Sequence, residues 1–159
     1  MNHYPLKIFF IILAGLLILS GCDETYDLPP SVYSGIDLSY SDSLITTSPV
    51  ISAYGLGVTG ADGTDSLLYD SVSTKEISLP FSINDNSAFV LTIDSIIDTL
   101  TIYHINTLTE ESIESGFYYE YEITSVNFTT NRIDSVAISD STVTSFWNEN
   151  LKIYINDNN

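Results

Sequence analysis

From residue 32 onward, apolar and polar residues alternate along the chain, and clusters of Asp, Asn, Gly and Pro interrupt the alternation at short intervals. Alternation with a period of two is typical of strands that bury one face, and the interruptions are typical of turns. Strands are predicted within residues 32–40, 50–58, 66–70, 75–81, 88–94, 99–105, 117–128, 133–139 and 151–155. About eight or nine short strands predict an all-β fold, namely a single antiparallel β-sandwich of the immunoglobulin-like kind.

The longest alternating segment, FYYEYEI, separates an aromatic face from an acidic one. Phe117, Tyr119, Tyr121 and Ile123 share the side predicted to enter the core, whereas Tyr118, Glu120 and Glu122 share the side predicted to face solvent. The apolar positions then shift to Val126 and Phe128, which predicts a β-bulge near Thr124 or Ser125. The next residues, TTNR at 129–132, predict the turn of a hairpin that returns into the following strand.

The N-terminal segment has a different pattern, in which Lys7 precedes an almost unbroken apolar run from Ile8 to Leu19. A cationic start and an apolar run of this length are typical of a secretory signal, whereas a membrane-spanning helix needs about 20 apolar residues. The sequence LSGC, in which Leu19, Ser20 and Gly21 precede Cys22, resembles the bacterial lipobox. The resemblance implies that the thiol of Cys22 is lipidated and that the peptide bond before it is cut.

We therefore expect a cleaved lipoprotein signal peptide at 1–21, an acidic, proline-containing tether at 22–31 and a β-sandwich domain at 32–159. The lipid on Cys22 would attach the chain to a membrane, because several acyl chains together anchor firmly. Cys22 is the only cysteine, so no disulfide can form within the chain.

Asp23, Glu24 and Asp27 follow the expected lipidation site and have three interpretations. In enteric lipoproteins, an aspartate directly after the cysteine tends to retain the protein at the inner membrane. In Bacteroidota-type lipoproteins, an acidic cluster at this place resembles a surface-export signal. The third interpretation is a solvated spacer that Pro29 and Pro30 stiffen.

The composition is strongly acidic, with 21 Asp and Glu against four Lys and Arg, and a formal net charge of −17. Removal of residues 1–21 would leave Lys75, Arg132 and Lys152 as the only Lys and Arg. Nucleic-acid binding needs clustered cationic side chains that displace counterions, so the composition excludes this function class. The same charge disfavours docking of the domain on anionic lipid headgroups and makes copies of the domain repel one another.

Most catalytic patterns are absent or out of context. GLGVTG at 55–60 matches G-x-G-x-x-G, but a strand pattern follows it where a nucleotide site needs a helix, so no cofactor is expected. After residue 21 the only histidine is His104, which is predicted as a strand-end residue. A single histidine without a G-x-S-x-G motif argues against a serine hydrolase and against a zinc site.

The acidic side chains leave two minor possibilities open. A carboxylate pair for acid–base catalysis could come from Glu110, Glu111 and Glu114, in a predicted loop, or from Glu120 and Glu122 on one strand face. Calcium could bind Asp62 and Asp65 in the loop ADGTD, although EF-hand spacing is absent there. Acidic turns and solvated acidic faces are the commoner explanations, so we expect neither a metal nor an enzyme.

A triplet recurs, in which Asp is followed by Ser or Thr and then by an aliphatic residue or Thr. It resembles the O-glycosylation acceptor of Bacteroidota envelope proteins. Strand sequences give the same pattern, with Asp at a turn, a small polar residue outward and an aliphatic residue inward. We favour the strand explanation for the pattern and keep glycosylation of one or two exposed sites as a hypothesis. The hydroxyl residues are Ser43, Ser66, Ser71, Ser95, Thr99, Ser135 and Ser141.

The order of the segments VISAYGLG, SLLYDSVSTKEISLPF, DTLTIY, GFYYEYEITSVNFTTNRIDSVAIS and NLKIYI resembles a group of small Bacteroidota-type lipoproteins of unknown function. The similarity covers most of residues 32–155. Members often have Cys-Gly before the long hairpin, whereas this chain has Ser115-Gly116, so any disulfide of the family is lost. The resemblance implies no catalytic residue, and it favours the surface-export interpretation of the acidic cluster.

These observations predict a lipid-anchored protein of the cell envelope that acts as a non-catalytic binding, adhesion or structural module. We expect it at the outer membrane, and on the cell surface rather than in the periplasm. The sequence does not identify a protein or glycan partner, although Tyr118 and Trp147 could contribute to such an interface. The alternative function is a periplasmic or surface enzyme, or a glycan-directed accessory, that uses a carboxylate pair.

Overall fold

A computed structural model describes residues 32–41, 46–59, 63–112, 116–144, 146 and 148–156. Within these ranges the chain forms ten strands: β1 (Tyr33–Tyr40), β2 (Val50–Thr59), β3 (Thr64–Ser73), β4 (Glu76–Pro80), β5 (Asn86–Ile93), β6 (Ile96–Ser112), β7 (Gly116–Phe128), β8 (Ile133–Ile138), β9 (Thr142–Val143) and β10 (Glu149–Ile155). No helix that could cross a membrane occurs among the described residues.

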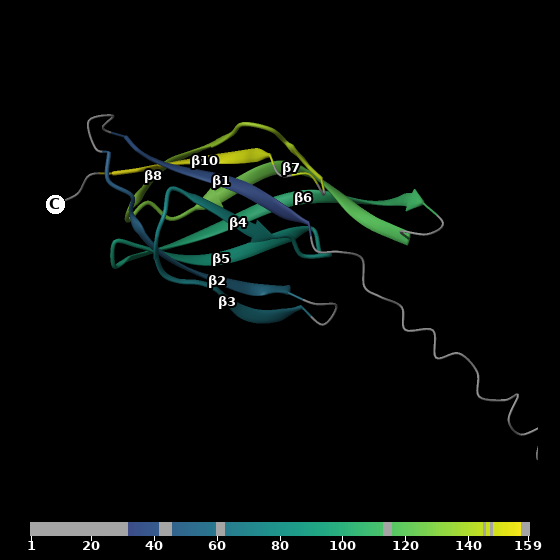
Figure 1. Ribbon diagram of the computed structural model, residues 1–159, viewed down its shortest axis with the longest axis horizontal. Coiled ribbons are helices and arrows are strands. Elements are labelled where there is room, and N and C mark those ends of the chain that lie inside the picture. The colour runs from purple at the N-terminus through teal and green to yellow at the C-terminus, as the bar shows by residue number, and fades with distance from the viewer. Residues whose placement is uncertain are drawn as a thin grey trace, which may run out of the picture.

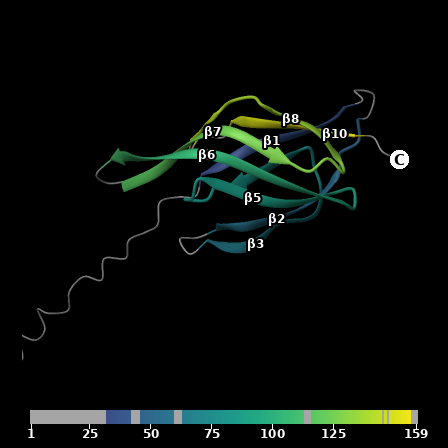
Figure 2. The same cartoon turned by 180° about the vertical axis from the view of Figure 1, so that it is seen from behind.

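The strands form two sheets that pack face to face (Figures 1 and 2). One sheet has the order β4-β1-β10-β8, and the other has the order β3-β2-β5-β6-β7-β9. Neighbouring strands are antiparallel except for β1 and β10, which run parallel. The predicted all-β sandwich is confirmed, and the two chain ends of the domain meet in its one parallel pair.

The core lies between the sheets and follows from the alternation in the sequence. In β5, Phe89, Leu91 and Ile93 are buried, while the residues between them are only partly covered. In the facing sheet, Ile36 and Leu38 of β1 are buried in the same core cluster. These strands thus bury alternate side chains. The removal of apolar area from water stabilises the fold by about 25 cal/mol per Å².

The predicted bulge in β7 is present. Tyr103 of β6 pairs with Ser125 and His104 pairs with Ile123, so Thr124 is the extra residue. The shift lets Val126 and Phe128 pack against the core, as the alternation predicted.

Phe117 corrects the prediction for the other end of β7, because its side chain is 54% exposed. The hairpin of β6 and β7 extends beyond the rest of the sandwich (Figures 1 and 2), so the facing sheet does not cover its far end. β6 is also longer than predicted and reaches Ser112, which places Glu110 and Glu111 in a strand and not in a loop.

The predicted hairpin turn at residues 129–132 is wrong. β7 belongs to the six-stranded sheet and β8 to the four-stranded sheet, where β8 pairs with β10. The TTNR segment is therefore a connection that crosses from one sheet to the other.

The glycine-rich end of β2 leads into another strand, β3, so the helix that a nucleotide site needs is not there. Gly57 and Gly63 both have positive φ values, 64° and 59°, in the hairpin that joins these strands. At Gly55 an added Cβ would lie 2.3 Å from Val58 Cγ2, so close packing also requires glycine.

Candidate functional site

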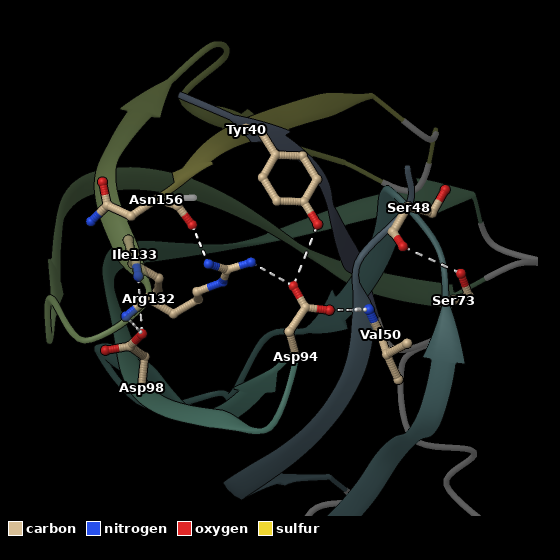
Figure 3. Close-up of polar contacts among 9 residues, drawn as sticks. All are labelled: Tyr40, Ser48, Val50, Ser73, Asp94, Asp98, Arg132, Ile133 and Asn156. Carbon is tan, nitrogen blue, oxygen red and sulfur yellow. Dashed lines mark hydrogen bonds and ion pairs between the residues drawn. The ribbon is translucent and has the colours of Figure 1, made fainter. Parts of the chain in front are cut away.

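Two clusters of buried polar side chains lie along β6, one near its start and one at its middle. The first is built around Asp98 (Figure 3). Its Oδ1 accepts hydrogen bonds from the Thr129 hydroxyl at 2.6 Å and the Asn131 N–H at 2.9 Å. Its Oδ2 accepts from the N–H groups of Arg132 at 2.7 Å and Ile133 at 3.0 Å. Burial by itself would raise the pKa of Asp98, but these four hydrogen bonds outweigh it and leave the pKa below its ordinary value. The ionised carboxylate thus holds the connection between β7 and β8.

Asp94 and Arg132 form an ion pair beside it, with Nη2 and Oδ2 2.7 Å apart (Figure 3). The same carboxylate accepts hydrogen bonds from the Val50 N–H at 2.9 Å and the Tyr40 hydroxyl at 3.4 Å, and Arg132 Nη1 donates to the Asn156 carbonyl. Burial would raise the pKa of Asp94, but the Val50 amide and Arg132 together lower it. We call Tyr40, Val50, Asp94, Arg132 and Asn156 the Asp94 clamp. It joins segments that are far apart in sequence and occupies Arg132 with an internal partner.

The second cluster surrounds His104, which is not at a strand end as predicted but within β6, with only 3% of its surface exposed. Its ring stacks on Phe81, with centroids 4.6 Å apart, and meets Tyr121 edge-on at 5.1 Å. Burial raises the pKa of Tyr121 to about 12, so its hydroxyl stays protonated at neutral pH.

The hydrogen bonds of His104 suit a neutral ring that carries its proton on Nδ1. Asn106 Nδ2 donates to the carbonyls of Ile83 and Asn84, so its Oδ1, 2.6 Å from His104 Nδ1, accepts a hydrogen bond from the N–H at that nitrogen. Nε2 then accepts from the Ser87 hydroxyl at 2.9 Å. Burial lowers the pKa of His104, although the Asn106 hydrogen bond and the Asp85 charge oppose this. The ring is therefore a structural link between β6 and the loop before β5, with no lone pair left for a substrate.

Beyond His104, the β6–β7 hairpin becomes a two-stranded ribbon, which we call the arm and define as residues 105–112 and 116–120. On the face that continues the core, Tyr119 is opposite Leu108, and Phe117 is opposite Glu110. Leu108 and Phe117 are each 54% exposed. Tyr119 is partly buried, and its ring centroid lies 6.1 Å from that of buried Tyr121. The apolar face of the core thus continues along the arm into solvent.

Of the acidic residues considered for catalysis, the described ones lie on the arm or directly beside it. Glu120 accepts hydrogen bonds from the hydroxyls of Thr109 at 3.3 Å and Tyr118 at 3.0 Å, and Glu110 and Glu122 are exposed. Tyr118 is half-buried, and the predicted contact residue Trp147 lies outside the described residues, as does Glu114.

The predicted lipidation and metal residues fall mostly outside the described ranges. These include Leu19, Ser20, Gly21, Cys22 and Asp62. Asp65 is exposed in β3, and its Oδ1 accepts the Gly57 N–H at 2.7 Å within the hairpin. Among the described residues, no group of three or more His, Cys, Asp or Glu is placed to hold a metal ion.

The glycosylation candidates are spread over both sheets. Ser71, Ser95, Thr99 and Ser135 are exposed, Ser66 and Ser141 are half-buried, and Ser43 lies outside the described residues. The structure does not bring them together into one site.

The sequence did not reveal the exposed pair Leu108 and Phe117. One feature of the sequence could have revealed it, namely the unequal predicted lengths of the two strands of the hairpin. The strand predicted at 117–128 is longer than that at 99–105, so part of it had to pair with the polar residues that follow Ile105. Asp98 gave no signal, because a buried aspartate in a strand has the same sequence pattern as an exposed one.

A family model described as a family of unknown function, DUF6452, matches residues 55–155. This range runs from β2 to the end of β10 and includes both polar clusters and the arm. No curated protein and no solved structure matches the chain. The chain belongs to the DUF6452 family.

Proposed function

We propose that this member of the DUF6452 family is a lipid-anchored protein of the cell envelope whose β-sandwich is a non-catalytic binding module. The observation that carries the proposal is the arm, which extends an apolar stripe of Tyr119, Leu108 and Phe117 away from the sandwich. Exposed apolar side chains grouped in this way are typical of interaction sites.

The polar clusters support the non-catalytic part of the proposal. Asp98, Arg132 and His104 are the buried carboxylate, guanidinium and imidazole groups among the described residues, and each has hydrogen bonds to the fold itself. A catalytic acid or base needs a proton position open to a substrate, and the hydrogen bonds of His104 and Asp98 occupy theirs.

The lipid anchor rests on the sequence around Cys22, where the apolar run, the small residues and the single cysteine coincide. We place the protein at the outer membrane and on the cell surface, because the acidic residues after Cys22 resemble a Bacteroidota export signal. O-glycosylation at one or two of the exposed sites Ser71, Ser95, Thr99 and Ser135 belongs to the same proposal.

Protease treatment of intact cells tests the location, with a C-terminal tag on the wild type and on Cys22→Ala. The expected result is membrane-bound wild type that is digested while the cells are unbroken, and a Cys22→Ala chain that leaves the membrane fraction. Protection of the wild type until the outer membrane is opened would contradict surface exposure. Retention of Cys22→Ala in the membrane fraction would contradict the lipid anchor.

A further inference from the structure

The arm is a ribbon whose strands have no third partner in the described part of the sheet. β5 pairs with β6 only as far as Tyr103, and β9 pairs with β7 only at Tyr121 and Glu122. Among the described residues, the outer edges of the arm therefore have no neighbouring strand to exchange backbone hydrogen bonds with, next to its exposed apolar face. An isolated two-stranded hairpin is marginally stable in water, so a ribbon of this kind gains stability when a surface covers it.

The negative charge of the arm indicates which kind of surface could cover it. Glu110, Glu120 and Glu122 lie on or beside it, and residues 105–122 contain no Lys or Arg. Elsewhere the described residues contain three cations. Arg132 is held in the Asp94 clamp, the Lys152 ammonium lies 3.2 Å from Asp37, and Lys75 directly precedes β4. A second copy of this chain would bring acid against acid, and anionic lipid headgroups would also be repelled. A basic protein surface is complementary.

The start of the domain places the arm relative to the proposed anchor. The Phe81 N–H donates to the Val32 carbonyl at 3.1 Å, and Phe81 packs on His104 and Tyr121 at the base of the arm. The first described residue thus lies at the end of the sandwich from which the arm projects (Figure 1). Residues 22–31 can span at most about 35 Å when fully extended. The arm is therefore held near the membrane that carries the lipid.

We propose that the arm docks on a basic surface with an apolar pocket, on a protein seated in the same membrane as the lipid anchor. This inference rests on the proposed lipid anchor. Leu108 and Phe117 supply the apolar contact, and Glu110, opposite Phe117 on the same face, supplies the charge complementarity.

Site-specific photocrosslinking of the full-length, lipidated chain in living cells tests the docking. A photoreactive phenylalanine analogue replaces Leu108 or Phe117, and the matched control position is Leu67, which is 58% exposed on β3. We expect one adduct of the same mass from both arm positions and none from the control. The crosslinked peptide of the partner, identified by mass spectrometry, should come from a membrane protein and carry net positive charge.

Reversing the charge of the arm tests whether the crosslinks depend on charge complementarity or arise from chance contact. Glu110→Lys, opposite Phe117 on the apolar face of the arm, should lower the adduct yield about tenfold. Glu76→Lys, an exposed control on β4, should leave it unchanged. The arm variants change exposed side chains only, so their free energies of unfolding in urea should match that of the wild type.

Any of the following would overturn the docking proposal: adducts with a second copy of this chain, adducts with lipid alone, equal adducts at Leu67, or a crosslinked partner peptide that is acidic or neutral. Membrane fractionation of the same strains, with Cys22→Ala beside them, reports on the anchor independently. Absence of arm adducts from a chain that remains membrane-bound through Cys22 would refute the docking and leave the proposed anchor standing.

Discussion

At the scale of single residues, Asp98 explains how the chain changes sheets. Its two carboxylate oxygens accept the N–H groups of three consecutive residues and one hydroxyl, all after the end of β7. These amides have left the six-stranded sheet and would otherwise be buried without partners, which costs about 1–3 kcal/mol for each group. One side chain therefore satisfies a connection that sheet pairing cannot satisfy.

Asp98→Ala should reduce the free energy of unfolding by about 3 kcal/mol or more, because it leaves buried donors without acceptors. Asp98→Asn, which replaces one accepting oxygen, should cost about 1–2 kcal/mol and keeps the test usable if the alanine variant does not fold. Urea unfolding measures both. Asp134→Ala, at an exposed aspartate on β8, should change stability by less than about 0.5 kcal/mol. Equal effects at both positions would refute this account of the connection.

His104 predicts how stability depends on pH. Its pKa in the folded protein is below the ordinary 6.5, chiefly because of burial, so the unfolded chain binds a proton first as the pH falls. The unfolding free energy should therefore decline from about pH 6.5 downward, until the pH reaches the lower pKa of the folded state. Asp94 and Asp98, whose pKa values lie below 3.8, contribute stability that is lost only in stronger acid.

Urea unfolding between about pH 8 and about pH 5 measures this dependence, because His104 is the only histidine after residue 21. His104→Gln should be less stable at neutral pH but should lack the decline below about pH 6.5. If the unfolding free energy fell equally with pH in the wild type and in His104→Gln, the buried ring of His104 would not be the cause of the decline.

At the scale of elements, the bulge at Thr124 lies where the arm leaves the sheet. Thr124 is opposite no residue of β6, and its hydroxyl donates to the Tyr103 carbonyl at 3.1 Å. A bulge bends a strand and increases its twist, so this residue sets the direction of the arm without changing which side chains face the core.

Deletion of Thr124 should therefore give a folded protein. Ile123 and Ser125 would become neighbours on opposite faces, and Val126 would still point inward. The expected loss is about 1–2 kcal/mol in urea unfolding, from the hydroxyl hydrogen bond and the changed twist. A deletion variant that does not unfold cooperatively would show that the bulge is needed for the core itself.

The alternation of apolar and polar residues in β7 predicted some features of the strand and missed others. It gave the faces of residues 119–128 and the position of the bulge, because register follows from which side chains are apolar. It placed Phe117 in the core because alternation does not reveal where the facing sheet ends. It also missed residues 106–112 of β6, since a ribbon that is exposed on both faces has no apolar period to detect.

At the scale of the whole molecule, the sequence predicted the sandwich but not the path between its sheets. The parallel pair of β1 and β10 and the crossing after β7 depend on contacts between distant residues, such as those of the Asp94 clamp. Of the proposed site, the acidic residues were visible in the sequence, whereas the exposed apolar stripe needed the structure. The strong negative charge and the arm together favour a basic partner protein. The proposed lipid anchor in the N-terminal segment favours a partner that lies in the same membrane.

We propose that this domain works while held to a membrane through Cys22. The most direct test is the intact mass of the native protein purified from membranes. The account predicts a chain that begins at Cys22 and carries long acyl chains on that residue, with hexose-sized increments if the exposed triplets are glycosylated. A chain with an unmodified Cys22, or one that begins at another residue, would contradict the lipid anchor and the membrane-proximal placement of the arm.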